Sequence, residues 1–292
     1  MSARDTVGAV RQQGLPSKLS ALRERRWQVI AVALVLLLGG GLWIALASSG
    51  SGGPQSQTAA PATPASPPPL PPPGIDLSAW KLSIPEENDD GNAASIEPAT
   101  LKEPWLAGTP DGGLMFWAPT SGATTKNSDH PRTELQSLTN FKAGTGPHTM
   151  TASVTLLQVP QDGGGIILGQ IHGADDISSV PYVMLRFEKN KLRVVVKQAQ
   201  KGGRLINYPL LDNVGLNSEI DYTLADLGNG SMTFSATYNG QTRQTTAPVP
   251  ALFQGATVRF QAGDYQQADD PGGAQDGGRV IFHRLAQQPT TP

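Results

Sequence analysis

Residues 220–246, IDYTLADLGNGSMTFSATYNGQTRQTT, contain the pattern that decides the fold class. Ile220–Leu227 and Ser231–Tyr238 alternate in strand fashion around a Gly-Asn-Gly turn, and Asn239-Gly240 then leads into Gln241–Thr246. An Asn-Gly pair between alternating runs is a strong signal for a two-residue β-hairpin. The stretch therefore predicts three consecutive antiparallel strands.

The same period of two recurs on both sides of this stretch, and no long amphipathic helix interrupts it. The further predicted strands are Leu114–Ala118, Thr149–Val159, Gly165–His172, Pro181–Phe187, Leu192–Gln198, Thr257–Ala262 and Arg279–Leu285. Short helices are expected only near Glu97–Leu101 and Ala251–Phe253. Many short strands with evenly spaced turns predict two packed antiparallel sheets or a closed barrel.

The N-terminal part of the chain has a different composition. Residues 1–26 form a basic arm, and residues 27–47 are uncharged and almost wholly apolar. Twenty-one residues at helical rise span about 30 Å, which matches the hydrocarbon core of a bilayer. We expect a single transmembrane helix with the basic arm in the cytoplasm and the remainder in the periplasm or outside the cell. The alternative is a signal peptide cleaved near Ala45-Leu46-Ala47, which would release a secreted protein.

Residues 48–73 are rich in Ser, Gly and Pro and predict a linker that holds the next domain away from the membrane. Residues 74–286 are long enough for one sizeable core, and residues 287–292 are expected to form a short tail. We expect the protein to be a monomer.

Charge and composition exclude several classes of function. Residues 74–286 hold 16 Lys and Arg against 22 Asp and Glu, a net charge near −6, so an acidic ligand needs a local basic groove. Nothing indicates a nucleic-acid partner. The chain of 292 residues has no cysteine, which excludes disulfides and thiolate chemistry. No zinc spacing, phosphate loop or dinucleotide fingerprint is present, so we expect neither metal nor cofactor.

Three short segments combine polar side chains with a strand pattern. Arg132 and Glu134 share one strand face, as do Gln170 and His172. Tyr265 follows Gly263, which permits close approach of backbone or ligand. Each residue has an ordinary explanation: a cross-strand ion pair, a surface histidine, a packing tyrosine. Alternatively, an Arg beside an acid can bind a substrate carboxylate, and an imidazole and a phenol can move protons.

A second group of basic residues lies in the predicted hairpin at 181–198. Arg186, Arg193 and Lys197 form either an ordinary solvated face or part of a groove for a negatively charged chain.

Taken in order along the chain, these segments resemble a known family. Ile75–Pro85, Arg132-Thr133-Glu134-Leu135, Gln170-Ile171-His172 and Phe260–Gln267 are similar to the motifs of the alginate lyases of polysaccharide lyase family seven. The resemblance covers essentially all of residues 74–286. It implies a β-jelly roll with a concave substrate groove, an acidic polysaccharide substrate and no metal.

The resemblance also implies residue roles in β-elimination. Arg132 and Gln170 would neutralise the uronate carboxylate, an effect of the oxyanion-hole type. His172 would remove the C5 proton of guluronate, and Tyr265 would protonate the glycosidic oxygen. For mannuronate, Tyr265 would serve as both base and acid. The products would carry a C4=C5 double bond.

Two positions depart from the family motifs. Gln136 and Gln261 stand where cationic residues are usual, and Arg259 appears two positions before Gln261. All three are candidate substrate-binding residues, and Arg259 is expected on the same strand face as Gln261. The departures leave open a different polyuronate, such as a glucuronan, as the substrate. A non-catalytic carbohydrate-binding module on the same fold is a further alternative.

Overall fold

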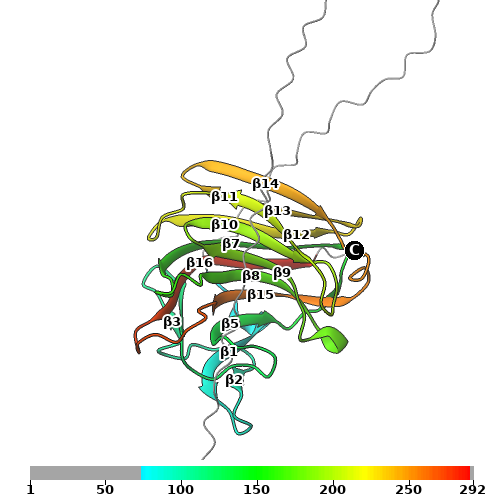
Figure 1. Cartoon of the computed structure of the whole chain (residues 1–292). Helices are drawn as coiled ribbons and strands as arrows, with labels where there is room; N and C mark the ends of the chain where they lie inside the picture. Colours follow the sequence, from blue (N-terminus) through cyan, green and yellow to red (C-terminus); the bar gives the residue numbers. More distant parts are fainter. Residues whose placement is uncertain (1–73, 290–292) are drawn as a thin grey trace, which may run out of the picture. The chain divides into compact units, whose positions relative to one another are not determined.

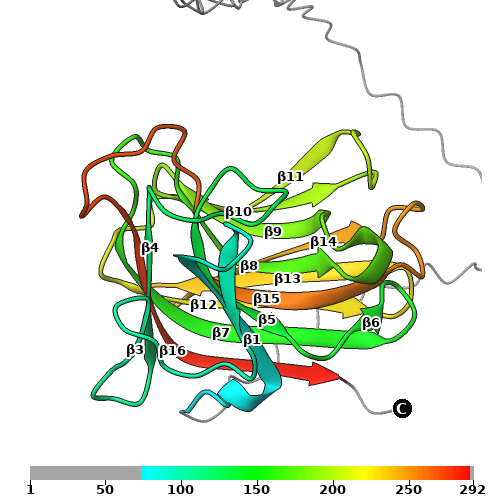
Figure 2. The same ribbon diagram turned by 90° about the horizontal axis from the view of Figure 1, so that it is seen from below.

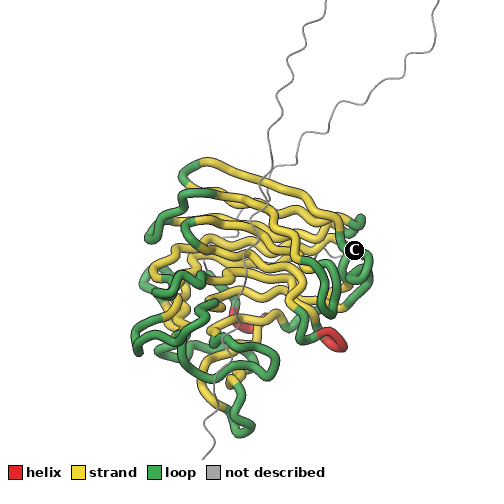
Figure 3. The backbone as a smooth tube through the Cα atoms, viewed as in Figure 1, coloured by secondary structure: helices red, strands yellow, loops and turns green. Residues whose placement is uncertain are grey.

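A computed structural model describes residues 74–289 as a sandwich of two antiparallel sheets (Figure 1). Helix is limited to two short 3₁₀ turns in this part of the chain, η1 (Leu77–Ala79) and η2 (Asp175–Ile177), which Figure 3 shows in red. The strands are β1 (Trp80–Glu87), β2 (Ala93–Ile96), β3 (Leu106–Gly108), β4 (Leu114–Pro119), β5 (Arg132–Ser137), β6 (Phe141–Lys142), β7 (Pro147–Gln158), β8 (Ile166–Gly173), β9 (Pro181–Glu188), β10 (Lys191–Lys197), β11 (Leu205–Leu211), β12 (Glu219–Leu227), β13 (Ser231–Tyr238), β14 (Gln241–Pro248), β15 (Thr257–Gln266) and β16 (Gly277–Pro289).

The two sheets have nine and seven strands. The nine-stranded sheet has the order β11-β10-β9-β8-β15-β5-β1-β2, with β6 paired to β15. The seven-stranded sheet has the order β14-β13-β12-β7-β16-β4-β3. Figure 2 shows the sandwich from below, with β1 of the first sheet near the viewer and β15 of the same sheet beside β7 of the second. The expected jelly-roll sandwich is therefore present, and the alternative of a closed barrel is not.

Local turn chemistry explains the hairpins that the sequence predicts. Asn239 and Gly240 both have positive φ, 49° and 73°, and join β13 to β14 with Tyr238 opposite Gln241. Lys189 and Asn190, with φ of 51° and 59°, join β9 to β10 in the same way. Two central residues of positive φ give the strand twist that a tight hairpin needs. The three consecutive antiparallel strands predicted for residues 220–246 are present as β12, β13 and β14.

The core lies between the sheets and is built by the alternate residues of each strand. The nine-stranded sheet contributes side chains such as Leu135 and Leu168, and the seven-stranded sheet contributes Phe116, Phe234 and Phe282. All five are fully buried. Since successive strand residues point to opposite faces, the polar residues between the inward-facing ones are turned toward the outer face of the nine-stranded sheet.

Strand β15, which carries the last motif, has a β-bulge where it pairs with β8. Relative to β8, β15 has one additional residue between Ala262 and Tyr265, while its pairing with β5 stays regular. Gly263, with φ of 153°, lies so close to β5 that a Cβ atom would approach the Thr133 carbonyl oxygen to 2.5 Å. The sequence predicts a close approach of backbone or ligand at Gly263, and it is the backbone of β5 that approaches. The regular pairing with β5 places Tyr265 directly opposite Arg132, and the bulge disturbs only the pairing with β8.

Several expectations were wrong. Residues 97–101 and 251–253 are bends and turns and not helices. Strands β1, β2, β3, β6 and β11 were missing from the predicted strands. The expected tail at 287–292 is incorrect for 287–289, because β16 pairs with β7 as far as Pro289.

The predicted basic arm, membrane segment and linker, residues 1–73, lie outside the described residues and stay predictions. Within residues 74–289, no helix is long and apolar enough to cross a membrane.

Candidate active site

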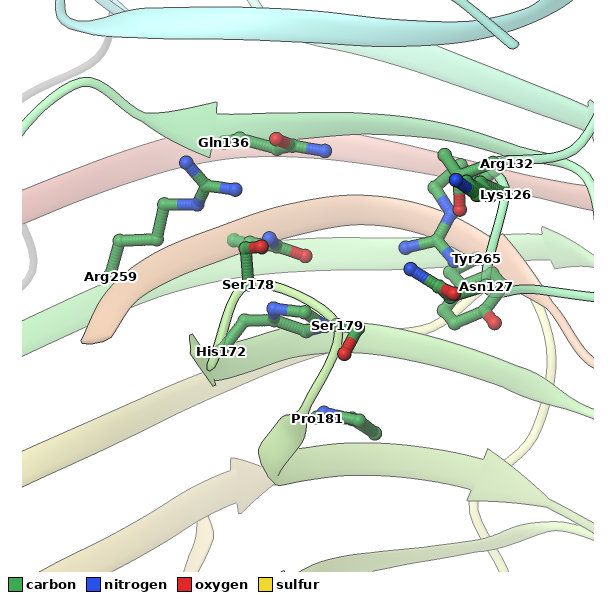
Figure 4. Close-up of a pocket in the computed structure, with 12 residues that line it drawn as sticks. Lys126, Asn127, Arg132, Gln136, His172, Ser178, Ser179, Pro181, Arg259 and Tyr265 are labelled. Atoms are coloured by element: carbon green, nitrogen blue, oxygen red, sulfur yellow. The ribbon is translucent and has the colours of Figure 1, made fainter. Parts of the chain in front are cut away.

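A pocket of about 260 Å³ opens on the outer face of the nine-stranded sheet (Figure 4). Its floor comes from β5, β8 and β15, which are neighbours in the sheet although they are far apart in sequence. Tyr265 pairs with Arg132, and Arg259 pairs with His172. Six of the ten residues that the sequence nominates line this pocket: Arg132, Gln136, His172, Arg259, Gln261 and Tyr265.

Arg132 is held by a buried acid and by an aromatic ring. Its Nη1 donates to Glu134 Oε2 at 3.1 Å, and its Cζ lies 3.6 Å from the centroid of the Tyr265 ring. Glu134 is fully buried, and burial raises the pKa of its carboxyl group while the Arg132 guanidinium opposes that rise. The ion pair fixes the guanidinium, because removing either charge would leave the other buried and unpaired.

Gln170 lies beneath the pocket and extends this network. Its Nε2 donates to Glu134 Oε1 at 2.6 Å and to Gln261 Oε1 at 3.1 Å. A carboxylate oxygen only accepts, so Glu134 sets the direction of the Gln170 amide, and Gln170 in turn sets that of Gln261. The NH₂ group of Gln261 is therefore left for the pocket. Both amide hydrogens of Gln170 are used within the protein, which differs from the expectation that Gln170 holds a substrate carboxylate directly.

His172 has the tautomer that a general base requires. Its Nδ1 lies 3.0 Å from the carbonyl oxygen of Gly173. Since a carbonyl only accepts, Nδ1 carries the proton and the Nε2 lone pair remains free. Burial lowers the pKa of His172 from 6.5 to about 4, and the positive charges of Arg132, Arg259 and Lys197 act in the same direction. The imidazole is neutral at physiological pH and can accept a proton.

Tyr265 brings its phenol to the side of the pocket opposite Arg259. The hydroxyl lies 2.9 Å from Ser128 Oγ, in the loop that precedes β5. The Arg132 guanidinium covers the face of the ring. An imidazole acceptor and a phenol donor thus line one pocket on either side of a guanidinium.

The pocket is locally cationic although the chain carries a formal net charge of −2. Lys126, Arg132 and Arg259 line it, and no Asp or Glu does. The Arg259 side chain makes no hydrogen bond or ion pair within residues 74–289, and its Nε is buried without a partner. Positive charge is therefore concentrated at this pocket, as an acidic ligand would need. A pair of catalytic carboxylates, which a glycoside hydrolase would need, is not present in this lining.

The three basic residues of the β9–β10 hairpin lie outside the pocket. Arg186 and Arg193 both form ion pairs with Glu188, at 3.4 Å for Arg186. Lys197 lies on the same face of β10 as Arg193, because residues four apart on a strand point to the same side. These residues extend the outer face of the nine-stranded sheet beyond the pocket, and the two arginines are already neutralised in part.

Sequence reasoning missed the loop residues that border the pocket. Thr125, Lys126 and Asn127 approach it from one loop, and Ser178 and Ser179 approach it from the segment after η2 (Figure 4). Loops have no periodicity from which a facing direction can be read. A polar run at 124–130 directly before a motif strand was the one available signal.

Together these groups can perform proton transfer beside a bound carboxylate. Cationic and amide donors surround a space bordered by a neutral imidazole and a phenol. No cluster of three or more His, Cys, Asp or Glu suited to a metal occurs among residues 74–289.

The chain is similar to known proteins in sequence and in fold. The sequence model of the alginate lyase family matches residues 75–288. A curated alginate lyase from Klebsiella pneumoniae is 31% identical over 147 residues, which cover 37% of this chain and 48% of that protein. The match thus spans about half the length of this curated relative.

Solved structures extend the likeness over the whole sandwich. A crystal structure of an alginate lyase of polysaccharide lyase family 7 has a TM-score of 0.61 at 27% identity, covering 73% of this chain and 96% of that one. An alginate lyase structure from Pseudomonas aeruginosa has a TM-score of 0.61 at 26% sequence identity, and the match covers 73% of this chain and 99% of that one. The alginate lyase structure from Klebsiella pneumoniae has a TM-score of 0.64, covering 73% of this chain and 96% of that one. Its sequence identity is 21%, so it supports the fold alone. On the family match over residues 75–288, this chain is a member of the alginate lyase family of polysaccharide lyases.

Proposed function

We propose that the pocket cleaves a polyuronate, alginate in the first instance, by β-elimination. The observation that carries the proposal is the neutral His172 with a free Nε2, placed in one cationic pocket with Tyr265. Elimination needs a base for the C5 hydrogen, an acid for the leaving oxygen and positive charge at the carboxylate between them. The lining supplies each of these groups.

The substrate carboxylate would be bound by groups that the protein leaves unpaired. Arg132 uses Nη1 on Glu134, and its other terminal nitrogen remains available to the pocket. Gln261 presents its NH₂ group for the reason given above. When the C5 proton leaves, negative charge spreads into the carboxylate, so donors fixed there favour the transition state over the ground state.

The proton steps balance without a co-reactant. His172 Nε2 takes the C5 proton of guluronate, the electron pair forms the C4=C5 double bond, and the C4–O bond breaks. Tyr265 gives its phenolic proton to the leaving oxygen and recovers one when His172 is deprotonated again. For mannuronate, whose C5 hydrogen lies on the other face of the ring, Tyr265 would act as both base and acid.

Relatives support alginate as the first substrate to test. A family-7 alginate lyase with one histidine changed to asparagine and one tyrosine to phenylalanine was crystallised with substrate, and its tyrosine variant with product. The neutral Gln136 and Gln261 and the unpaired Arg259 give this chain a different set of carboxylate contacts. They favour, as the second candidate, a polyuronate other than alginate.

The test is an ultraviolet assay for the new double bond. Purified full-length protein is incubated with mannuronate-rich, guluronate-rich and mixed alginates and with glucuronan. We expect absorbance to rise on at least one alginate and Tyr265→Phe to abolish the rise. A rise on glucuronan alone would move the substrate to the second candidate. No rise with any polymer, from protein that unfolds cooperatively, would contradict the proposal.

A further inference from the structure

Ser128 is the hydrogen-bond partner of the Tyr265 hydroxyl, and it lies in a loop that is fixed at its base. The Ser128 N–H donates to the Thr125 carbonyl at 2.9 Å. The preceding residue, Thr124, accepts from the N–H of Ala93 in β2 at 2.9 Å. Ser128 thus reaches Tyr265 from a loop that is attached to a neighbouring strand.

The hydrogens around Ser128 can be assigned from their partners. Ser128 Oγ donates to the His130 carbonyl at 3.0 Å and accepts from the His130 N–H at 3.2 Å. A serine has one hydroxyl hydrogen, and the His130 carbonyl uses it. In the 2.9 Å contact between the two hydroxyls, Tyr265 must therefore be the donor. The phenolic hydrogen points at Ser128, and a lone pair of Tyr265 remains for the pocket.

We propose that Ser128 is a positioning residue that serves Tyr265 in both of its protonation states. While Tyr265 is a phenol, Ser128 accepts its hydrogen. After Tyr265 has given up that hydrogen, the Ser128 hydroxyl turns from the His130 carbonyl and donates to the phenolate oxygen. This inference rests on the proposed role of Tyr265 in proton transfer.

The rotation transfers no proton from Ser128. For the transfer, the phenolic O–H turns from Ser128 toward the leaving glycosidic oxygen and gives its proton to that oxygen. The Ser128 hydrogen stays on Oγ, and the His130 carbonyl loses one hydrogen bond while the phenolate gains one. A hydrogen bond to a charged oxygen is stronger than one to a neutral carbonyl. The exchange therefore favours the state in which Tyr265 has released its proton.

Other charged and titratable groups near Tyr265 do not fulfil this role. Arg132 from β5 lies over the ring face and not at the hydroxyl. The His130 ring lies 6.3 Å from the Tyr265 ring, centroid to centroid. Lys126, Arg259 and His172 line the same pocket, but among residues 74–289 none of them forms a hydrogen bond with the phenol. Within residues 74–289, Ser128 is the hydrogen-bond partner of this hydroxyl.

The first test compares kinetics of Ser128→Ala and Ser128→Thr on the polymer that the wild-type protein cleaves best. Loss of a hydrogen bond worth about 1.4 kcal/mol corresponds to about a tenfold change. We expect Ser128→Ala to lower kcat about tenfold with KM little changed, and Ser128→Thr to retain most of kcat. Ser121→Ala, in the same loop at an exposed position, is the matched control and should behave as wild type.

The KM value separates positioning from a loosened loop. Lys126 and Asn127 line the pocket from the same loop. If Ser128→Ala merely disordered this loop, KM would rise together with any fall in kcat, and Ser128→Thr would restore little. That result would overturn the proposal.

A second measurement reads Tyr265 without turnover. The phenolate absorbance of the protein is titrated against pH, and subtraction of the Tyr265→Phe curve isolates Tyr265. We expect Ser128→Ala to move the midpoint of this difference curve to higher pH by about one unit. An unchanged midpoint would overturn the proposal even if kcat fell. A shifted midpoint in a protein without lyase activity would uphold the Ser128–Tyr265 coupling while contradicting the proposed function.

Discussion

The outer faces of the two sheets carry similar residues in different surroundings. On the seven-stranded sheet, His283 joins Thr155 through Nε2 at 2.9 Å and Asp111 through Nδ1 at 3.1 Å. This series of hydroxyl, imidazole and carboxylate superficially suits nucleophilic catalysis better than His172, which has only a backbone carbonyl on Nδ1. Yet the Asp111 side chain is 60% exposed, and no member of the series lines the cationic pocket.

The difference shows that residue types alone do not make this site. On the nine-stranded sheet, Glu134 and Gln170 are fully buried and Arg132 nearly so, while the paired charges of the other sheet stand in solvent. Low-dielectric surroundings strengthen each electrostatic effect and shift the pKa of His172. The site is defined by desolvated groups that converge on one space.

The largest expected effect on kcat comes from replacing each of the two histidines, His172 and His283, in a separate variant. His172→Asn should lower kcat about 10³-fold, because a positioned base contributes between about 10² and 10⁴. His283→Asn, on the other sheet, should leave kcat within about twofold of wild type. Both are measured by the double-bond assay on guluronate-rich polymer. If the two variants lost equal activity, the distinction between the faces would fail.

The second prediction compares how much a buried and an exposed glutamate contribute to the free energy of unfolding. Glu134→Gln leaves the Arg132 charge without its partner and should lower the free energy of unfolding by about 3 kcal/mol. Glu219→Gln removes an exposed partner of Arg284, at 3.3 Å, and should change it by less than about 1 kcal/mol. Urea denaturation monitored by tryptophan fluorescence gives both values. A loss of similar size in the two variants would mean that Glu134 is not held as an ion-paired carboxylate.

These contrasts also show what the sequence could predict. Alternation places Arg132 and Glu134 on one face, and likewise Gln170 and His172, whatever the neighbouring strands are. The hairpin at Asn239-Gly240 follows from local backbone preference. Both kinds of prediction were confirmed because they depend on a few adjacent residues.

What was missed depends on contacts between distant segments. The ion pair of Arg193 with Glu188 depends on the pairing of β10 with β9 across the hairpin. The side chains of Lys126 and Ser178 reach the pocket because their loops are fixed by other strands. The use of both Gln170 amide hydrogens within the protein required the pairing of β15 with β8. None of this has a periodic signal.

The pH profile is the third prediction. His172 must be neutral to accept a proton, and its pKa is lowered to about 4 by burial and by the surrounding cations. The kcat/KM value should therefore be unaffected by this group above about pH 5 and fall about tenfold per pH unit below 4. A free histidine would place this limb near pH 6.5. An acid limb at 6 or above on guluronate-rich polymer would mean that His172 is solvated or is not the base.

The smallest expected effect concerns the unpaired arginine of the pocket. Arg259 has no partner among residues 74–289, whereas Arg284 on the opposite sheet pairs with Glu219 and Asp221. An unpaired guanidinium can bind a uronate carboxylate equally in ground and transition states, which affects KM and not kcat. Arg259→Gln should raise KM about fivefold at constant kcat, and Arg284→Gln should leave KM unchanged. Because a carboxylate contact is weakened by salt, the KM of wild type should rise with ionic strength more steeply than that of Arg259→Gln. Equal salt dependence in the two proteins would instead assign carboxylate binding to Arg132 and Lys126 alone.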